Sequence, residues 1–543
     1  MKGSFWRILV SFLVLFAAPG LYCSESTYLT VIYTNDTHST MFPYGPHDDW
    51  GGIARMSTRI KELKSGGPNV LVLNTGDVFV GSFEFNKYLG YPELKIMEGL
   101  YDAMCLGNHE FDLGIDVLTG ALSGAIAGGP PVSLPVLCAN INLDGQPVLK
   151  NFVKPYIVKE VGGVKVGLFG VLNTIPIGYS PDVLALLADP YAAAGEAVRK
   201  LRTFEGADIV VCLSHLGMMS EVAELSQVPG IDIIVGGHSH DALSGPIVHN
   251  GKIIVQAGEF GRYLGRLVVK ISGTGVSLVS GELLPVDASV RQDPALLPTL
   301  NALRDGIVSD PRFGPVYTRY VATAPWDLTE RWDLNVPERD TPLGNLVADA
   351  IKTCVVEAGF PADIALEASG YIAAAVYEGK VVGNDIMRAL PYGYDPASGL
   401  GFKIDTVLLA GLQILAGLEF SVSQVEYMDD TAMQVSGLTF EYDSTRTPMD
   451  PQQLVYNFMN GIWEWGRVDP FSIRVNGQPI DFTDVYWVAL NETLHGFLIS
   501  QGLIPYAEVS TGLFLYSAVR DFMAARRVLD YRAEGRVIDK SVQ

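Results

Sequence analysis

Short apolar runs alternate with helix-length amphipathic stretches through the first half of the chain. Several runs are apolar almost without interruption, which is typical of strands covered on both faces. The expected strands are Tyr28–Tyr33, Val70–Asn74, Ala103–Leu106, Val164–Val171, Asp208–Ser214 and Ile231–Val235. Stretches such as Ile53–Leu63 and Ala192–Phe204 lie between them and have the length of helices. This alternation predicts a layered α/β domain.

The pattern changes around residues 285–340. Pro294–Ile307 could form a linking helix, and Pro311–Pro342 carries several prolines without clear periodicity. Beyond this stretch the chain reads as a separate α+β domain, with the domain boundary near residues 310–335. Its expected helices are Leu343–Ala358, Val407–Ser421 and Leu513–Val528, and its expected strands are Ala432–Tyr442 and Trp487–Leu490.

Five polar motifs follow the predicted strands of the first domain. They are Asn35-Asp36-Thr37-His38, Gly76-Asp77, Gly107-Asn108-His109-Glu110, Ser214-His215 and Gly236-Gly237-His238-Ser239-His240. In open α/β sheets, functional groups gather beyond the carboxyl ends of the strands. We therefore expect these loops to meet in one site, although their residues are distant in sequence.

The residue types in these motifs are those that bind divalent metals. Carboxylate, imidazole and amide oxygen suit Zn, Mn, Fe, Co or similar ions. Seven candidate ligands are too many for one tetrahedral site and suit two ions that share a bridging carboxylate. The candidate ligands are Asp36, His38, Asp77, Asn108, His215, His238 and His240. The neighbouring glycines would allow sharp turns and leave room for the ions.

Each motif alone also has an ordinary structural explanation. Asp36-x-His38 and Gly76-Asp77 could be turns, and His215 could be a satisfied histidine at a strand end. The chain holds eight histidines, however, and five of them lie in these motifs. The combination, each motif directly after a buried strand, favours the metal site.

Length and charge narrow the classes of function. A chain of 543 residues is too long for one hydrophobic core, so two or more domains are expected. The net charge of −22 argues against a nucleic-acid-binding surface, although it could simply keep the protein soluble. A phosphate substrate fits this charge only if metal ions supply local positive charge.

The N-terminus resembles an export signal. Lys2 and Arg7 precede the apolar run Ile8–Ala18, and Ala18-Pro19-Gly20 offers small residues for cleavage. The run is shorter than the ~20 residues that span a bilayer as a helix, and no later segment looks like a membrane span. We expect an exported protein, periplasmic or at the cell surface. A lipid-modified Cys23 and a retained anchor are less favoured alternatives.

The order of the motifs resembles that of the calcineurin-like metallophosphoesterases. More narrowly, the chain is similar to the 5′-nucleotidase and UDP-sugar hydrolase family. Supporting segments are Gly51-Gly52-Ile53-Ala54-Arg55, Gly107-Asn108-His109-Glu110-Phe111-Asp112, Gly236-Gly237-His238-Ser239-His240, Leu343-Gly344-Asn345-Leu346-Val347-Ala348-Asp349 and Leu390-Pro391-Tyr392-Gly393. The likeness is strong in the first half and patchy in the second.

This resemblance implies a four-layer α/β/β/α domain followed by an α+β substrate-binding domain that swings. The expected division is a signal peptide at 1–23, the metallophosphoesterase domain at 24–310, a linker at 311–335 and the C-terminal domain at 336–543. The proline-rich junction is compatible with a hinge or with an ordinary rigid linker.

The resemblance also implies roles for individual residues. Asp36, His38, Asp77 and His240 would hold one metal, and Asp77, Asn108, His215 and His238 the other. Many relatives carry Gln at the position of His240, where imidazole is an equally good ligand. His109 corresponds to the family's catalytic histidine and would pair with Asp112. Asp112 could instead cap the start of a helix.

Two segments depart from the family pattern. Typical nucleotidases carry Gly-Gly-Ile-Arg where this chain has Ser369-Gly370-Tyr371-Ile372-Ala373, so Ala373 replaces an arginine that contacts substrate. The Gly-Asp-Gly-aromatic segment of the base-stacking clamp is also missing after Val488-Ala489-Leu490-Asn491. We predict a hydrolase of small-molecule phosphate esters or anhydrides with altered nucleotide recognition, and we assign no substrate-binding residues. The alternatives are a non-catalytic binding protein on this fold and a thiohydrolase of the same architecture.

Overall fold

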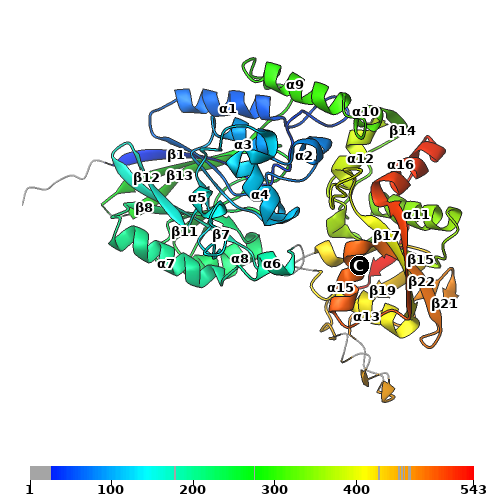
Figure 1. Ribbon diagram of the computed structural model, residues 1–543. Coiled ribbons are helices and arrows are strands. Elements are labelled where there is room, and N and C mark those ends of the chain that lie inside the picture. Colours follow the sequence, from blue (N-terminus) through cyan, green and yellow to red (C-terminus); the bar gives the residue numbers. More distant parts are fainter. Residues whose placement is uncertain are drawn as a thin grey trace, which may run out of the picture.

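The computed structural model describes residues 26–175, 179–273, 275–425, 429–450, 453, 456–457, 459–462 and 466–542. The predicted signal segment at 1–23, including Cys23, lies outside these residues. The described chain forms two layered domains that meet along one side (Figure 1). None of its helices is both long and apolar enough to cross a membrane.

The N-terminal domain is built on two sheets. The first has the strand order β13 (Gly275–Pro285), β12 (Tyr263–Ser272), β1 (Thr27–Thr34), β2 (Val70–Asn74), β3 (Ala103–Cys105), β4 (Val136–Leu137) and β5 (Val153–Lys154). The second has the order β10 (Ile247–His249), β11 (Lys252–Val255), β9 (Ile233–Val235), β8 (Ile209–His215), β7 (Val164–Leu172) and β6 (Tyr156–Val161). The predicted strands are confirmed, with small shifts at their ends.

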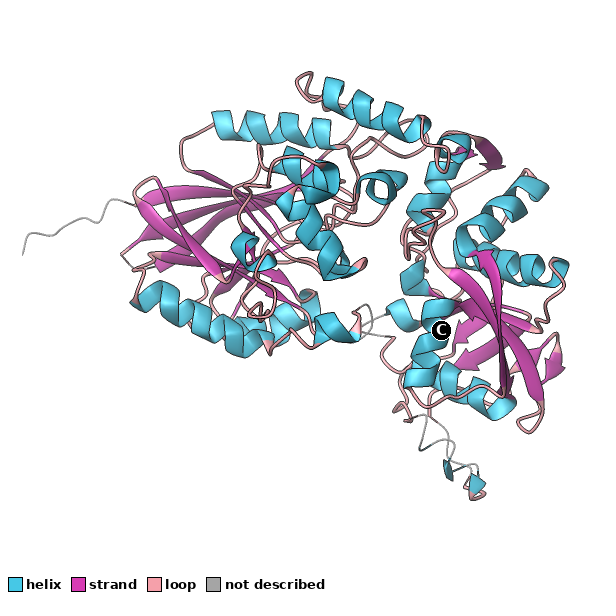
Figure 2. Cartoon of the chain, in the orientation of Figure 1, coloured by secondary structure: helices cyan, strands magenta, loops and turns pink. Residues whose placement is uncertain are grey.

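The two sheets pack face to face, and helices cover both outer faces (Figure 2). Alternate residues of β1 divide between two cores, because successive side chains of a strand point to opposite faces. Val31 packs between the sheets with Leu168 of β7 and Val211 of β8. Ile32 packs outward with Ile60 of α1 (Ile53–Ser65) and Leu118 of α4 (Gly114–Ser123).

The outer face of the second sheet packs against α7 (Pro190–Thr203) and the segment after α8 (Met218–Ala223). Helix α7 begins where the sequence provides a cap, since the Asp189 carboxylate accepts a hydrogen bond from the Ala192 amide at 2.6 Å. The four layers are therefore α/β/β/α, as predicted.

The C-terminal domain is centred on a mixed sheet with helices on both faces. Its strand order is β18 (Met433–Ser436), β15 (Ile364–Ala368), β22 (Val485–Asn491), β17 (Lys403–Ala410) and β23 (Ala507–Phe514). One face packs against α11 (Pro342–Glu357), α12 (Gly383–Ala389) and α16 (Leu515–Arg526). The other packs against α13 (Gly411–Ser421) and α15 (Glu492–Ser500). This is the expected α+β domain.

Smaller elements complete this domain. Strands β21 (Gln478–Pro479), β20 (Arg474–Val475), β19 (Leu438–Tyr442) and β24 (Val537–Asp539) form a second sheet, and β14 (Tyr320–Ala324) pairs with β16 (Gly379–Val382). Helix α10 (Gly314–Tyr317) and β14 both lie inside the predicted linker 311–335. The domain limits at 24–310 and 336–543 stay a prediction.

One helix prediction is wrong in its first part. Val407–Ser421 was expected to be a single helix, but Val407–Ala410 belongs to β17 and the helix α13 begins at Gly411. The periodicity of a continuous apolar run does not distinguish a buried strand from a buried helix. The sequence pattern therefore does not reveal the boundary between β17 and α13.

Helix α2 (Phe83–Tyr88) of the N-terminal domain reaches into the C-terminal domain. The Phe83 ring is fully buried at 5.3 Å from the Phe313 ring and 5.5 Å from the Tyr516 ring. The Asn86 amide donates a hydrogen bond to the Gly399 carbonyl at 2.8 Å. The two domains therefore share part of one hydrophobic core.

Candidate metal centre

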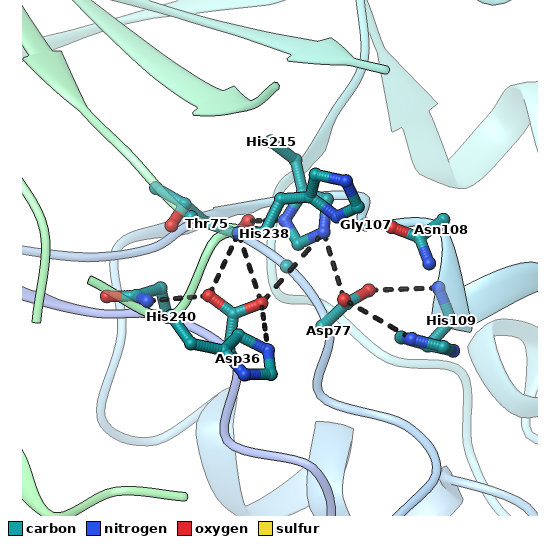
Figure 3. A network of polar contacts seen from close by, with 12 residues as sticks. Asp36, Thr75, Asp77, Gly107, Asn108, His109, His215, His238 and His240 are labelled. Carbon is teal, nitrogen blue, oxygen red and sulfur yellow. Dashed lines mark hydrogen bonds and ion pairs between the residues drawn. The ribbon is translucent and has the colours of Figure 1, made fainter. Parts of the chain in front are cut away.

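The predicted ligands lie close together, and Figure 3 labels all of them except His38, which lies beside Asp36 and His240. Strands β1, β2 and β3 are parallel to one another, as are β8 and β9, so their carboxyl ends meet there. Asp36 and His38 follow β1, Asp77 follows β2, Asn108 and His109 follow β3, His215 ends β8, and His238 and His240 follow β9.

The ligand atoms form two groups. Asp36, His38 and His240 bring one atom each within 4.8 Å of one another, and Asp77, His215 and His238 do the same. The groups are adjacent, because Asp36 Oδ1 lies 4.0 Å from His215 Nε2. The structure therefore contains two adjacent groups that could each hold a metal ion, while the assignment of individual ligands to them stays a prediction.

His215 directs Nε2 toward its group. Its Nδ1 lies 2.6 Å from the Thr75 carbonyl oxygen, and only a protonated Nδ1 can donate to that oxygen. Nε2 lies 3.0 Å from Asp77 Oδ2, and the Asp77 carboxylate outweighs burial and raises the pKa of His215 to about 9. A metal ion binds imidazole in place of such a proton, so a buried imidazole nitrogen that faces a carboxylate fits a divalent ion.

The imidazoles of His38 and His238 are in the neutral form. Burial and the neighbouring His240 lower the pKa of His38 to about 4. Burial and His215 lower the pKa of His238 to about 3. Both rings are therefore neutral at pH 7, and a neutral imidazole is the form that binds metal.

Five of the candidate ligands have a left-handed backbone. Their φ angles are 49° at Asp36, 45° at His38, 52° at Asp77, 74° at His238 and 57° at His240. Residues other than glycine rarely adopt these angles, and such strain clusters at functional sites. The strain is a second indication of function, independent of side-chain chemistry.

Asn108 is held in place by a residue that the sequence did not point out. Asn173 donates from Nδ2 to Asn108 Oδ1 at 3.2 Å and lies 3.4 Å from the His215 carbonyl oxygen. Asn173 follows β7 in the same way that the ligands follow their strands, so its position at a strand end was the available signal.

His109 and Asp112 form the predicted pair at the rim of the site. Nδ1 of His109 lies 2.9 Å from Asp112 Oδ2, and Nε2 lies 3.9 Å from Asp77 Oδ2. Burial opposes the charged imidazole, but the Asp112 and Asp77 carboxylates outweigh it and raise the pKa of His109 to about 10. Tyr392 of the C-terminal domain stacks on the His109 ring, with centroids 5.1 Å apart.

Glu110 holds the two ligand loops together. Its carboxylate accepts hydrogen bonds from the backbone amides of Asp77, Val78, Phe79 and Gly107, at 2.6–3.1 Å. The sequence placed Glu110 inside a motif without giving it a role. Its contacts show that it fixes the loop after β2 against the loop after β3.

Two family models match this chain. The calcineurin-like phosphoesterase model matches residues 29–242, and the 5′-nucleotidase C-terminal domain model matches residues 321–497. These ranges contain the candidate metal centre and most of the C-terminal domain, respectively.

Individual relatives agree with these matches. The trifunctional nucleotide phosphoesterase protein YfkN of Bacillus subtilis is 30% identical over 77% of this chain, which spans 29% of that longer protein. The 5′-nucleotidase of Rattus norvegicus is 27% identical over 95% of this chain and 91% of its own length. The crystal structure of a 5′-nucleotidase precursor from Thermus thermophilus matches with a TM-score of 0.79 and 28% identity, covering 94% of this chain and 99% of that one.

Proposed function

The chain belongs to the 5′-nucleotidase family of calcineurin-like phosphoesterases, and from this premise we propose that it is an exported two-metal hydrolase of phosphate esters or anhydrides. The observation that carries the proposal is the pair of adjacent ligand groups, with His109 beside them. One metal would be held by Asp36, His38, Asp77 and His240. The other would be held by Asp77, Asn108, His215 and His238.

Divalent ions at these positions would supply the positive charge that neutralises a phosphate and activates water. His109 would donate a proton to the leaving oxygen or stabilise it as charge develops. Asp112 supports this role because its contact with Nδ1 fixes the ring and turns Nε2 toward the ligands. Tyr392 covers one face of the same ring and would exclude water there.

We further propose that recognition of nucleotides is altered. Ala373, which stands where relatives carry an arginine, packs against the aromatic cluster of Tyr44 and Phe260. The Phe260 ring lies 5.5 Å from the His38 ring, so this aromatic cluster borders the metal centre. Without that arginine the site lacks one charge-assisted contact to an anionic group.

An assay panel with the metal-loaded chain tests both proposals. It comprises AMP, other nucleotides, UDP-glucose, cyclic nucleotides, sugar phosphates and p-nitrophenyl phosphates. We expect hydrolysis of phosphoesters, with the generic ester turned over at least as well, relative to AMP, as by an ordinary nucleotidase. Chelation should abolish activity without unfolding the chain, and adding Mn, Zn or Co should restore it. Asp77→Ala is the control for contaminating phosphatases.

The outcomes separate the alternatives. Full activity in the chelated protein would contradict the two-metal mechanism. Bound metal without turnover of any phosphoester would favour the non-catalytic binding protein. A strong preference for 5′-nucleotides over every other substrate would show that different residues have rebuilt the base clamp, so only the altered recognition would be wrong.

Export is proposed from the N-terminal sequence. Lys2 and Arg7 before the apolar run Ile8–Ala18 support a cleaved signal. N-terminal sequencing of the mature protein should give a start between Leu21 and Ser24, in a fraction outside the cytoplasm. A start at Met1 would contradict export, and a blocked, lipidated Cys23 would favour the lipoprotein.

A further inference from the structure

Glu259 lies behind the metal centre and contacts one of its ligands. It lies in the loop between β11 and β12. The Phe260 amide donates a hydrogen bond to the Asp36 carbonyl at 2.8 Å, which ties this segment to the loop that carries two candidate ligands. The Glu259 carboxylate is thereby brought to His240, and Oε2 contacts the ring at Nδ1.

The two nitrogens of His240 face opposite partners. Nε2 lies 3.5 Å from Asp36 Oδ1 and 3.2 Å from His38 Nε2, within the first ligand group. Nδ1 faces Glu259, so a proton on Nδ1 has an acceptor, and Nε2 is the nitrogen that is left to bind a metal in the first ligand group. Both side chains are largely buried, at 16% and 13% exposed, so water competes little for this contact.

A residue from the C-terminal side of the molecule reaches the same carboxylate. Arg331 Nη2 lies 3.4 Å from Glu259 Oε2. Arg331 follows β14, and the nearby Leu328 forms a bridge with Val376 of the C-terminal domain. The guanidinium therefore links the metal centre to the other domain through Glu259.

We propose that Glu259 is a positioning residue for His240 and that Arg331 holds the Glu259 carboxylate in place. The inference rests on the proposed metal centre and adds to it a path by which the C-terminal domain acts on the first metal position. Removal of a carboxylate behind a ligating histidine typically lowers metal affinity by about 10–100-fold, which sets the size of the expected effect.

The test measures metal binding by the full chain rather than activity. Chelated protein is dialysed against graded concentrations of Zn²⁺ or Mn²⁺ alone, and bound metal is counted. Glu259→Ala should weaken one of two sites by about 10–100-fold and leave the other unchanged. Glu259→Gln keeps an oxygen that can accept a hydrogen bond from His240 Nδ1. The metal affinity of this variant should therefore lie between those of Glu259→Ala and the wild type. Arg331→Ala should give a smaller loss at the same site.

Glu282→Ala is the matched control, because Glu282 pairs with Arg266 at 2.9 Å on the edge strand β13 and belongs to neither ligand group. It should bind two metals like the wild type. The inference would be overturned if Glu259→Ala bound metal at two sites with wild-type affinity. It would also be overturned if Glu259→Ala and Glu282→Ala lost metal affinity to the same extent. A wild-type chain that binds no metal would instead overturn the proposed function on which the inference rests. If Glu259→Ala does not fold without metal, Glu259→Gln and Arg331→Ala decide the matter.

Discussion

At the scale of single residues, the sequence motifs identified the candidate ligands but not the backbone conformation of these residues. Glycines beside the ligands were expected to make the sharp turns, and Gly76 does so with a φ of 93°. In the loop after β9, however, the positive φ belongs to His238 and His240 themselves. Gly237 serves a different need, since a Cβ there would lie 3.1 Å from His215 Nδ1 and 3.2 Å from Asp36 Oδ2. Tertiary crowding of this kind has no signal in one sequence.

His109→Asn should separate catalysis from metal binding. The side chain contacts Asp112 and lies beside the ligand groups without belonging to either. We expect kcat to fall by about 10²–10⁴, the usual range for general acid–base groups, while metal content stays near that of the wild type. Asp77→Ala should instead lose metal. Loss of metal from His109→Asn, measured after dialysis, would make His109 a ligand rather than a proton donor.

At the scale of elements, prediction succeeded where composition and length were decisive. Val70–Asn74 is an apolar run with a turn at each end, and β2 has those limits. The failure at Val407–Ser421 arose because strand and helix follow one another without a break in hydrophobicity. The roles of loop residues were the least predictable. Glu110 accepts hydrogen bonds from backbone amides and Asn173 donates one to Asn108, and these partners come together only when the strand ends assemble.

The turns after β2 and β3 are packed against each other so closely that a methyl group should separate them. A Cβ at Gly107 would lie 2.1 Å from Asp77 Oδ1 and 2.5 Å from the Asp77 backbone nitrogen. Gly107→Ala should therefore displace the Asp77 carboxylate and lower metal content together with the melting temperature. Gly145→Ala is the control, because nothing lies within 4 Å of its Cβ. Equal metal content in the two variants would show that the turn yields without moving Asp77.

At the scale of the whole molecule, the sequence indicated two domains but not how they touch. The stacking of Tyr392 on His109 and the contact of Arg331 with Glu259 join residues more than 70 positions apart. The two residues of each contact lie in different sequence motifs or outside any motif, so no local sequence pattern predicts that they meet. The family resemblance implied a substrate-binding domain that swings. The described contacts place that domain directly against the proposed catalytic residue.

Phe83→Ala should test how strongly the domains depend on each other. The ring is completely buried among residues of the C-terminal core, so its truncation should lower the free energy of unfolding by about 3–5 kcal/mol. Calorimetry should show one transition in the wild type and two, or one broadened transition, in the variant. Phe204→Ala, at a ring that is 68% exposed, should change stability by less than about 0.5 kcal/mol. Two well-separated transitions in the wild type would contradict the coupling.

The position of Phe83 also bears on how the chain is made. Tyr516, which covers its ring, follows it by 433 residues (516 − 83). At a synthesis rate of roughly 5–20 residues per second, about 20–90 s pass between the two residues. During that interval the N-terminal strands can already pair, but the Phe83 ring of α2 lacks the contact that Tyr516 makes with it. Helix α16 thus completes the burial of a ring that lies in the first sixth of the chain, and we expect that ring to be more exposed in the nascent chain until α16 is made.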